Sequence, residues 1–275
     1  MMKKIDMHVH CAPPGNRFAS PDDIRPMYER LGIEHGVLMT MGMKDPRSML
    51  GDVIGWWFAP VGPLDAEGDF LPLLQEYVAM GASGVTEQTV SIPLDDHRYL
   101  ALFGACAQLR LPATLHFRSP NSNSYGVVDE LHLPRLERVL QQVEGVRLIG
   151  HSPIFWNEIS TDVTDENREG YLTTPLQGEG RIQELLRKYP NLYCDLSANS
   201  AFCALMRDED YACRFLEEFQ DQVLYATDIA AADAMKQPFA RLSGWLDEMA
   251  ESGRISRAAY EKICRENALR LLNRE

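Results

Sequence analysis

Two histidines separated by one residue, His8 and His10, lie in the N-terminal apolar run of the chain. Alternate side chains of an extended strand share a face, so both imidazoles and the carboxylate of Asp6 are expected on one side. Two imidazoles on the same side of a strand provide half of a site for a transition-metal ion. Such an ion can activate water and polarise a carbonyl or phosphoryl oxygen, so the spacing indicates metal-assisted chemistry.

Further candidate ligands stand where later apolar runs end. They are Glu87, His116, His151 and Asp228. Imidazole and carboxylate groups suit zinc, manganese, iron or cobalt, and one carboxylate can bridge two ions. The set fits two ions, with His8, His10 and Asp228 on one, His116 and His151 on the other, and Glu87 between them.

The elements that must position these residues alternate along the chain. Apolar runs typical of buried strands cover residues 5–10, 36–40, 56–61, 84–88, 113–117, 146–151, 192–196 and 223–228. Helical patterns cover residues 22–31, 70–80, 96–109, 134–142, 179–189, 203–219 and 237–251. Repeated strand and helix units predict an α/β fold, a (β/α)8 TIM barrel in regular or distorted form, with the metal site at the C-terminal ends of the strands.

Three long connections follow predicted strands, at residues 11–19, 118–131 and 152–177. Loops of this length in a compact domain commonly carry function, so they are expected to form the mouth of the site. The final stretch, residues 256–272, is predicted to be a helix that packs against the barrel. Residues 1–275 are therefore expected to form a single barrel domain.

Composition restricts the class of partner. A formal net charge of −13 disfavours binding to nucleic acid or anionic membranes and leaves a small-molecule substrate as the expectation. The chain shows no apolar leader or membrane-length run, and its six cysteines form no C-x-x-C pair, which together predict a cytoplasmic protein. An apolar face on an outer helix could support a homo-oligomer.

The order of these residues resembles the amidohydrolase superfamily, and its amidohydrolase-2 branch in particular. The resemblance rests on the segments at residues 5–10, 81–85, 150–153, 227–228 and 267–272. Many members of that superfamily bridge two metals with a carboxylated lysine, whereas this chain offers Glu87, as in a glutamate-bridged subtype that includes TatD-type deoxyribonucleases. The resemblance supports the metal ligands His8, His10, Glu87, His116, His151 and Asp228.

The activity implied by the resemblance is hydrolysis of an amide, ester or lactone bond in a small polar substrate by a metal-activated hydroxide. Asp228 is expected to act as general base and then general acid. Zinc is the first candidate metal, as one or two ions, with manganese, iron or cobalt as alternatives. Arg118, Tyr125 and Trp156 are the predicted substrate contacts, from loops at the barrel mouth.

Three other functions fit the same residues. A non-oxidative decarboxylase of the same superfamily would act on a carboxylated substrate. A TatD-like phosphodiester hydrolase would cleave phosphodiesters, which the acidic charge disfavours. A non-catalytic metal-binding module would be expected to have lost some of the six ligands. His35, His97 and His132 lie away from strand C-termini and are excluded from the site, while Asp6 is expected to give hydrogen-bond support.

Overall fold

The computed structural model describes residues 2–43, 45–62 and 69–274. Parallel strands form its centre in two sheets. The first is β1 (Lys4–Val9), β2 (Ile33–Met39) and β3 (Ile54–Phe58). The second has the order β4 (Val85–Gln88), β5 (Pro112–Arg118), β7 (Arg147–His151), β8 (Leu192–Asp195) and β9 (Val223–Leu224). A short strand, β6 (Val127–Val128), pairs with β5 outside this order.

Isolated parallel bridges join the two sheets at both edges. Ala59, just after β3, pairs with Val85 of β4, and Val9 of β1 pairs with Ile229, just after β9. Backbone hydrogen bonds reinforce the second junction, because Met7 donates to Tyr225 at 3.0 Å and Asp228 donates to His8 at 2.8 Å. The eight strands therefore close into a ring, which confirms the predicted (β/α)8 architecture.

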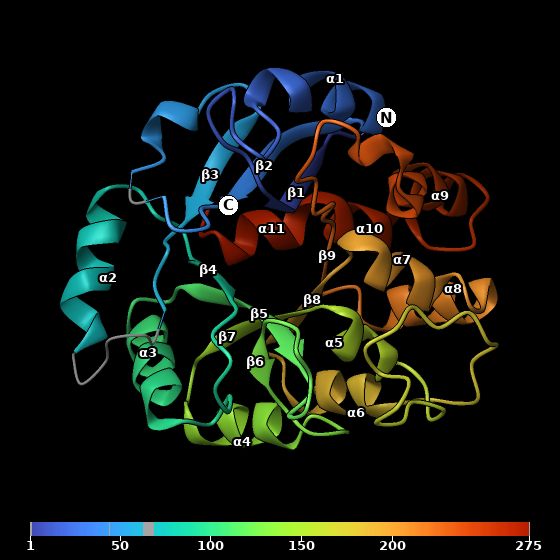
Figure 1. Ribbon diagram of the computed structural model, residues 1–275. Coiled ribbons are helices and arrows are strands. Elements are labelled where there is room, and N and C mark those ends of the chain that lie inside the picture. The colour runs from blue at the N-terminus through green and yellow to red at the C-terminus, as the bar shows by residue number, and fades with distance from the viewer. Residues whose placement is uncertain (1, 44, 63–68, 275) are drawn as a thin grey trace.

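Helices surround this ring (Figure 1). They are α1 (Pro21–Leu31), α2 (Phe70–Ala79), α3 (His97–Gln108), α4 (Pro134–Gln142), α6 (Arg181–Lys188), α7 (Ala198–Leu205), α8 (Glu209–Glu218) and α9 (Leu242–Glu251). Side chains cap the starts of two of them in the usual way: Ser20 and Asp23 form a capping box at α1, and Asp96 caps α3 by accepting from the Arg98 amide.

The prediction of one helix over residues 203–219 is wrong. Helix α7 ends at Leu205, and the Asp208 side chain accepts a hydrogen bond from the Tyr211 amide at 2.9 Å, which starts α8. The long connections are also more ordered than predicted, since residues 118–131 contain β6 and residues 152–177 contain the short helix α5 (Pro153–Asn157).

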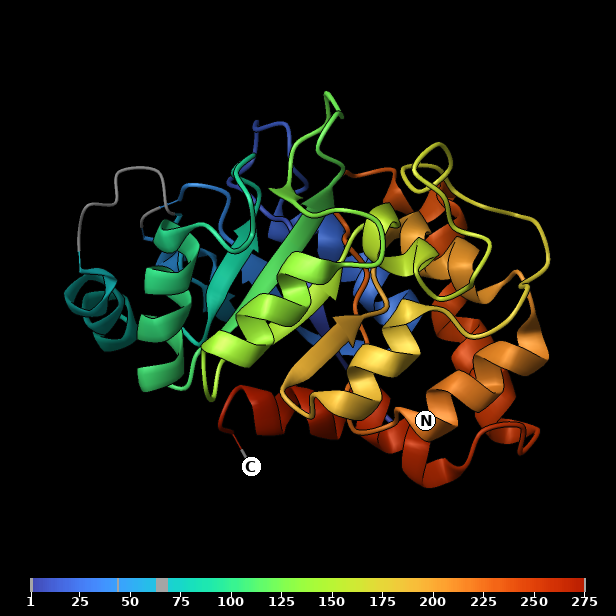
Figure 2. The same ribbon diagram turned by 90° about the horizontal axis from the view of Figure 1, so that it is seen from below.

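The C-terminal segment closes one end of the barrel. It consists of α10 (Arg257–Glu261), a π-helical turn (Lys262–Glu266) and α11 (Asn267–Leu271). Ala268, Leu271 and Leu272 pack with barrel-interior residues such as Met7 and Leu224, which confirms the predicted packing of this segment. In Figure 2 this red segment lies at the end opposite the long loops. The site must therefore open at the C-terminal ends of the strands.

No helix in the described part of the chain is long and apolar enough to cross a membrane.

Candidate metal centre

The structure brings together all six predicted ligands at the C-terminal end of the barrel. His8 lies near the end of β1 and His10 just beyond it, Glu87 lies in β4, and Asp228 follows β9. His116 and His151 are register partners on the neighbouring strands β5 and β7. The closure of the barrel therefore places donors from both ends of the sequence around one centre.

Donor atoms of His8, His10 and Asp228 lie close together. His8 Nε2 and His10 Nε2 are 3.2 Å apart, and Asp228 Oδ1 lies 3.1 Å from His10 Nε2 and 3.8 Å from His8 Nε2. Four ligand atoms at about 2.1 Å from a zinc ion are separated from one another by roughly 3.4 Å in a tetrahedral site. These three separations bracket that value, so the donor set fits a divalent transition-metal ion.

Glu87 lies between this group and the other two histidines. Its Oε2 atom is 4.0 Å from His10 Nε2, and its Oε1 atom is 3.7 Å from His151 Nε2. Oε1 is also 2.6 Å from His116 Nδ1, which is a hydrogen-bond distance. A cation held by both groups would take the place of this hydrogen bond. The two carboxylate oxygens thus face different histidines, as a bridging carboxylate requires.

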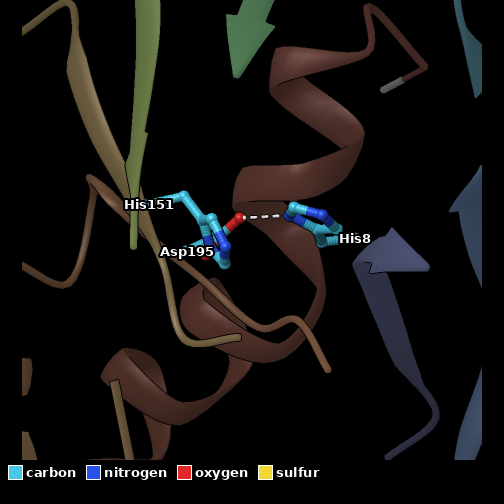
Figure 3. A group of neighbouring side chains, drawn as sticks. All are labelled: His8, His151 and Asp195. Carbon is cyan, nitrogen blue, oxygen red and sulfur yellow. Dashed lines mark hydrogen bonds and ion pairs between the residues drawn. The ribbon is translucent and has the colours of Figure 1, made fainter. Parts of the chain in front are cut away.

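Asp195 orients two of the histidines, and sequence reasoning did not identify it. One of its oxygens lies 2.9 Å from His8 Nδ1, and the other lies 3.0 Å from His151 Nδ1 and accepts from Ser197 Oγ at 2.6 Å (Figure 3). Carboxylates that accept from one ring nitrogen direct the other nitrogen toward a metal. The signal was present, because Asp195 ends its strand just as His151 ends its own.

The electrostatics of the cluster favour positive charge. Burial would lower the pKa of His8, but the hydrogen bond to Asp195 and the charges of Asp195 and Asp228 outweigh it and raise the pKa to about 10. Burial would raise the pKa of Glu87, yet the hydrogen bond and charge of His116 hold it well below its usual range. A site that stabilises protons on imidazole in this way also attracts divalent cations.

Asp228 is held in an unusual backbone conformation. Its φ angle is 60°, in the left-handed region that non-glycine residues rarely adopt. Asp6 supports this turn, because its carboxylate accepts from the Thr227 amide at 2.9 Å and from the Thr227 hydroxyl at 2.5 Å. Asp6 also accepts from the His8 amide at 3.1 Å and from the Tyr28 hydroxyl at 2.8 Å. It therefore joins the strand of His8 to the turn of Asp228 without contacting the imidazoles.

A cavity of about 210 Å³ lies next to His116. Arg118 and Tyr125, two of the predicted substrate contacts, line it together with Glu169 and Tyr171. The Tyr125 ring lies 4.3 Å from the His116 ring at an angle of 34°. The cavity is small and mixes aromatic, polar and charged groups.

Trp156 is not among the lining residues, so the prediction that it contacts substrate is corrected. It belongs to α5, its side chain is fully buried, and its indole donates a hydrogen bond to the Asp195 carbonyl at 3.1 Å. From the sequence alone, a tryptophan that follows the end of a strand is expected to line a pocket. Here its hydrogen bond stabilises the strand that carries Asp195. The excluded histidines have other partners: His35 contacts Trp56, His97 pairs with Asp96, and His132 pairs with Glu158.

Comparison with solved structures supports the fold. The 2,6-dihydroxybenzoate decarboxylase from Rhizobium is 17% identical with a TM-score of 0.60, covering 99% of each chain. The 5-carboxyvanillate decarboxylase from Novosphingobium aromaticivorans, solved with manganese and a nitrobenzoic acid, is 13% identical with a TM-score of 0.59, covering 98% of this chain and 96% of that one. A D-hydantoinase from Thermus sp. is 11% identical with a TM-score of 0.60, covering 98% and 70%.

A search of curated proteins gave no match. The sequence model of the family described as Amidohydrolase matches residues 5–274, from β1 to the end of the C-terminal segment. This match and the order of the donors along the barrel lead to one conclusion: the chain belongs to the amidohydrolase family.

Proposed function

We propose that the protein is a divalent-metal-dependent hydrolase that cleaves an amide, ester or lactone bond of a small polar substrate. One observation carries the proposal. The side chain of Asp228 is 27% exposed, while those of His8, His10 and Glu87 are 0%, 7% and 4% exposed. The group best suited to accept a proton is therefore the most exposed of these side chains.

His8, His10 and Asp228 would hold the first ion, and Glu87 would share it with a second ion beside His116 and His151. Zinc is the proposed metal. When bound, such an ion lowers the pKa of water toward neutrality and polarises the oxygen of the bond to be cleaved.

Asp228 is the proposed proton carrier. Burial would raise its pKa, but the hydrogen bond with His10 and the charges of His8 and His10 hold the pKa below its ordinary value, so the carboxylate is ionised at neutral pH. It can then accept a proton from the attacking water and transfer that proton to the leaving group. The strained turn at Asp228 and its support by Asp6 keep the carboxylate directed at the cluster.

Decarboxylation is the second candidate, because two of the similar structures are decarboxylases of hydroxylated benzoates. The tyrosines at positions 125 and 171 that line the cavity would also suit a flat substrate. Both reactions would use the same cluster of residues. Only the identity of the product therefore distinguishes the two candidate functions.

The test is a product analysis with zinc-loaded or manganese-loaded protein. One panel contains lactones, cyclic amides and simple esters; the other contains hydroxybenzoates. Ring opening or ester cleavage that disappears after chelation supports the hydrolase. Release of CO2 from the hydroxybenzoates without hydrolysis of the first panel would replace it with the decarboxylase, and no metal-dependent turnover of either panel would contradict both.

A further inference from the structure

The connection between β5 and β6 projects beyond the strand end that carries His116. In Figure 2 it is the green loop that stands out at the end of the barrel opposite the C-terminal segment. Residues 119–125 read Ser-Pro-Asn-Ser-Asn-Ser-Tyr, and Tyr125, their only aromatic side chain, is 57% exposed. Burial of apolar side chains therefore contributes little to holding this segment, which we call the flap.

Both ends of the flap are fixed. At one end Arg118 belongs to β5, and at the other end β6 pairs with β5. The Gly126 amide donates to the Thr89 carbonyl at 3.1 Å, and its φ angle is 132°. A Cβ atom at Gly126 would lie 2.6 Å from the His116 carbonyl oxygen, so only glycine fits at this end. Motion of the flap would therefore pivot at these two ends and leave the barrel unchanged.

The flap is held together by hydrogen bonds of its own loop. Arg118 donates from Nε to the Ser119 carbonyl at 3.2 Å and from Nη2 to the Ser122 carbonyl. The Ser122 amide donates to the Ser119 carbonyl at 3.2 Å, and the Ser124 amide donates to Ser122 Oγ at 2.9 Å. Arg118 is therefore bound to its own loop, and the flap is expected to move as one body.

One carboxylate attaches the flap to the rest of the chain. Glu169, in the connection between α5 and α6, accepts from the Ser119 amide at 3.2 Å and from the Ser122 hydroxyl at 2.7 Å, with one oxygen for each donor. In the part of the chain that the structure describes, these are the only hydrogen bonds from residues 119–125 beyond their own loop. Burial would raise the pKa of Glu169, but the hydrogen bonds from Ser122 and Ser119 and the charge of Arg118 lower it. The carboxylate is therefore ionised at neutral pH and both of its oxygens can accept.

The attached flap covers the centre on the side of His116. The Tyr125 ring lies 4.3 Å from the His116 ring at an angle of 34°, and His116 is only 8% exposed. The cavity of about 210 Å³ is lined by Ser124 and Tyr125 from the flap and by Glu169 and Tyr171 from the facing connection. The contact between Glu169 and the flap therefore joins two walls of this cavity.

We propose that the flap is a movable cover of the metal centre and that Glu169 is the latch that holds it closed. Opening breaks the two hydrogen bonds to Glu169 and moves Tyr125 away from His116, which admits substrate and releases product. Both bonds are exposed, so water replaces them when they break and the closure is reversible. This inference rests on the proposed function, because the flap controls access to the same centre.

The test combines two measurements on the full-length protein. Hydrogen–deuterium exchange of residues 119–125 is followed in the zinc-loaded protein. Access to His116 is measured after chelation, as the rate of its modification by diethyl pyrocarbonate, located by mass spectrometry. The variants are Glu169→Ala, which removes the latch, and Tyr125→Ala, which removes the cover and keeps the latch. Glu166→Ala is the matched control, because it removes an exposed glutamate from the same connection.

We expect Glu169→Ala to raise both the exchange of the flap and the modification of His116 about tenfold. Tyr125→Ala should raise the modification of His116 and leave the exchange at Ser119 unchanged, and Glu166→Ala should match wild type in both. His97, whose side chain is 81% exposed, should be modified at the same rate in every protein.

Unchanged exchange of the flap in Glu169→Ala would overturn the latch. Faster exchange without faster modification of His116 would show that the flap loosens without uncovering the centre, which would overturn its role as a cover. Neither measurement needs turnover, so the two proposals fail separately. A latched flap in a protein without hydrolytic activity would contradict the proposed function alone, and metal-dependent hydrolysis with equal modification of His116 in all variants would contradict the flap alone.

Discussion

The carboxylate of Asp195 contacts both His8 and His151, with Oδ2 2.9 Å from one Nδ1 atom and Oδ1 3.0 Å from the other. These histidines come from strands that lie on different sides of β8 and β9 in the ring. One carboxylate therefore sets the ring orientation of a donor in each half of the centre. Ser197 donates to that carboxylate from its amide and its hydroxyl, and the Trp156 indole donates to the backbone carbonyl of Asp195.

Replacing Asp195 with asparagine should weaken metal binding by roughly 10–100-fold, because the amide has one acceptor oxygen in place of two and leaves one histidine unrestrained. Competition with a chelating indicator measures the change. Asp233→Asn, at a carboxylate that is 64% exposed, is the control and should bind metal as wild type does. Unchanged affinity in Asp195→Asn would show that the histidines need no such orientation.

Asp228→Asn should lower turnover by roughly 10²–10⁴-fold, the usual cost of losing a general base. Most of the metal should remain, since His8, His10 and Glu87 are retained. Turnover and metal content are measured on the same sample, with the thermal unfolding midpoint as the check on folding. A variant that keeps its metal and its turnover would remove Asp228 from the chemistry.

Gly150→Ala should destabilise the fold by about 1–3 kcal/mol, because overpacking in a core is costly. A Cβ atom at Gly150 would lie 2.2 Å from Cε2 of Phe155, beside the strand end that carries His151. Gly104→Ala is the matched control: the space around Gly104 in α3 is open, and alanine favours a helix by roughly 0.5–1 kcal/mol. Urea unfolding compares the two; equal stability would contradict the packing described here.

Asp96 should make folding sensitive to acid. Hydrogen bonds from the Arg98 side chain and amide lower the pKa of Asp96 from 3.8 to about 2. The stabilisation is therefore complete above pH 4 and is lost as the pH falls through 2. Between pH 4 and pH 2 the free energy of unfolding of wild type should fall by about 1 kcal/mol more than that of Asp96→Asn. The difference is modest because solvent screens the interaction between Asp96 and Arg98.

Acid-dependent urea unfolding of both proteins measures this difference. Asp52→Asn, at an exposed carboxylate, is the control and should follow wild type. Parallel curves for wild type and Asp96→Asn would exclude a contribution from this helix cap.

The sequence was sufficient to predict the barrel and the convergence of the six candidate ligands, because strand ends in a parallel barrel meet at one face and these residues lay at or near the ends of apolar runs. The sequence was insufficient where tertiary contacts determine a helix boundary or the position of a loop side chain. The turn at Asp208 divides a continuous helical pattern into α7 and α8 through a single capping side chain. The burial of Trp156 and the commitment of Arg118 to its own loop depend on how the loops pack, which one-dimensional periodicity does not contain.

The metal centre is best tested by counting divalent ions per chain in wild type and Glu87→Gln after purification with excess zinc. The double variant His8→Ala/His10→Ala is measured beside them. We expect two ions in wild type, at most one in Glu87→Gln and a loss from the first site in the double variant. One ion in both wild type and Glu87→Gln would contradict the shared role of Glu87, and no ion in wild type would contradict the metal centre itself.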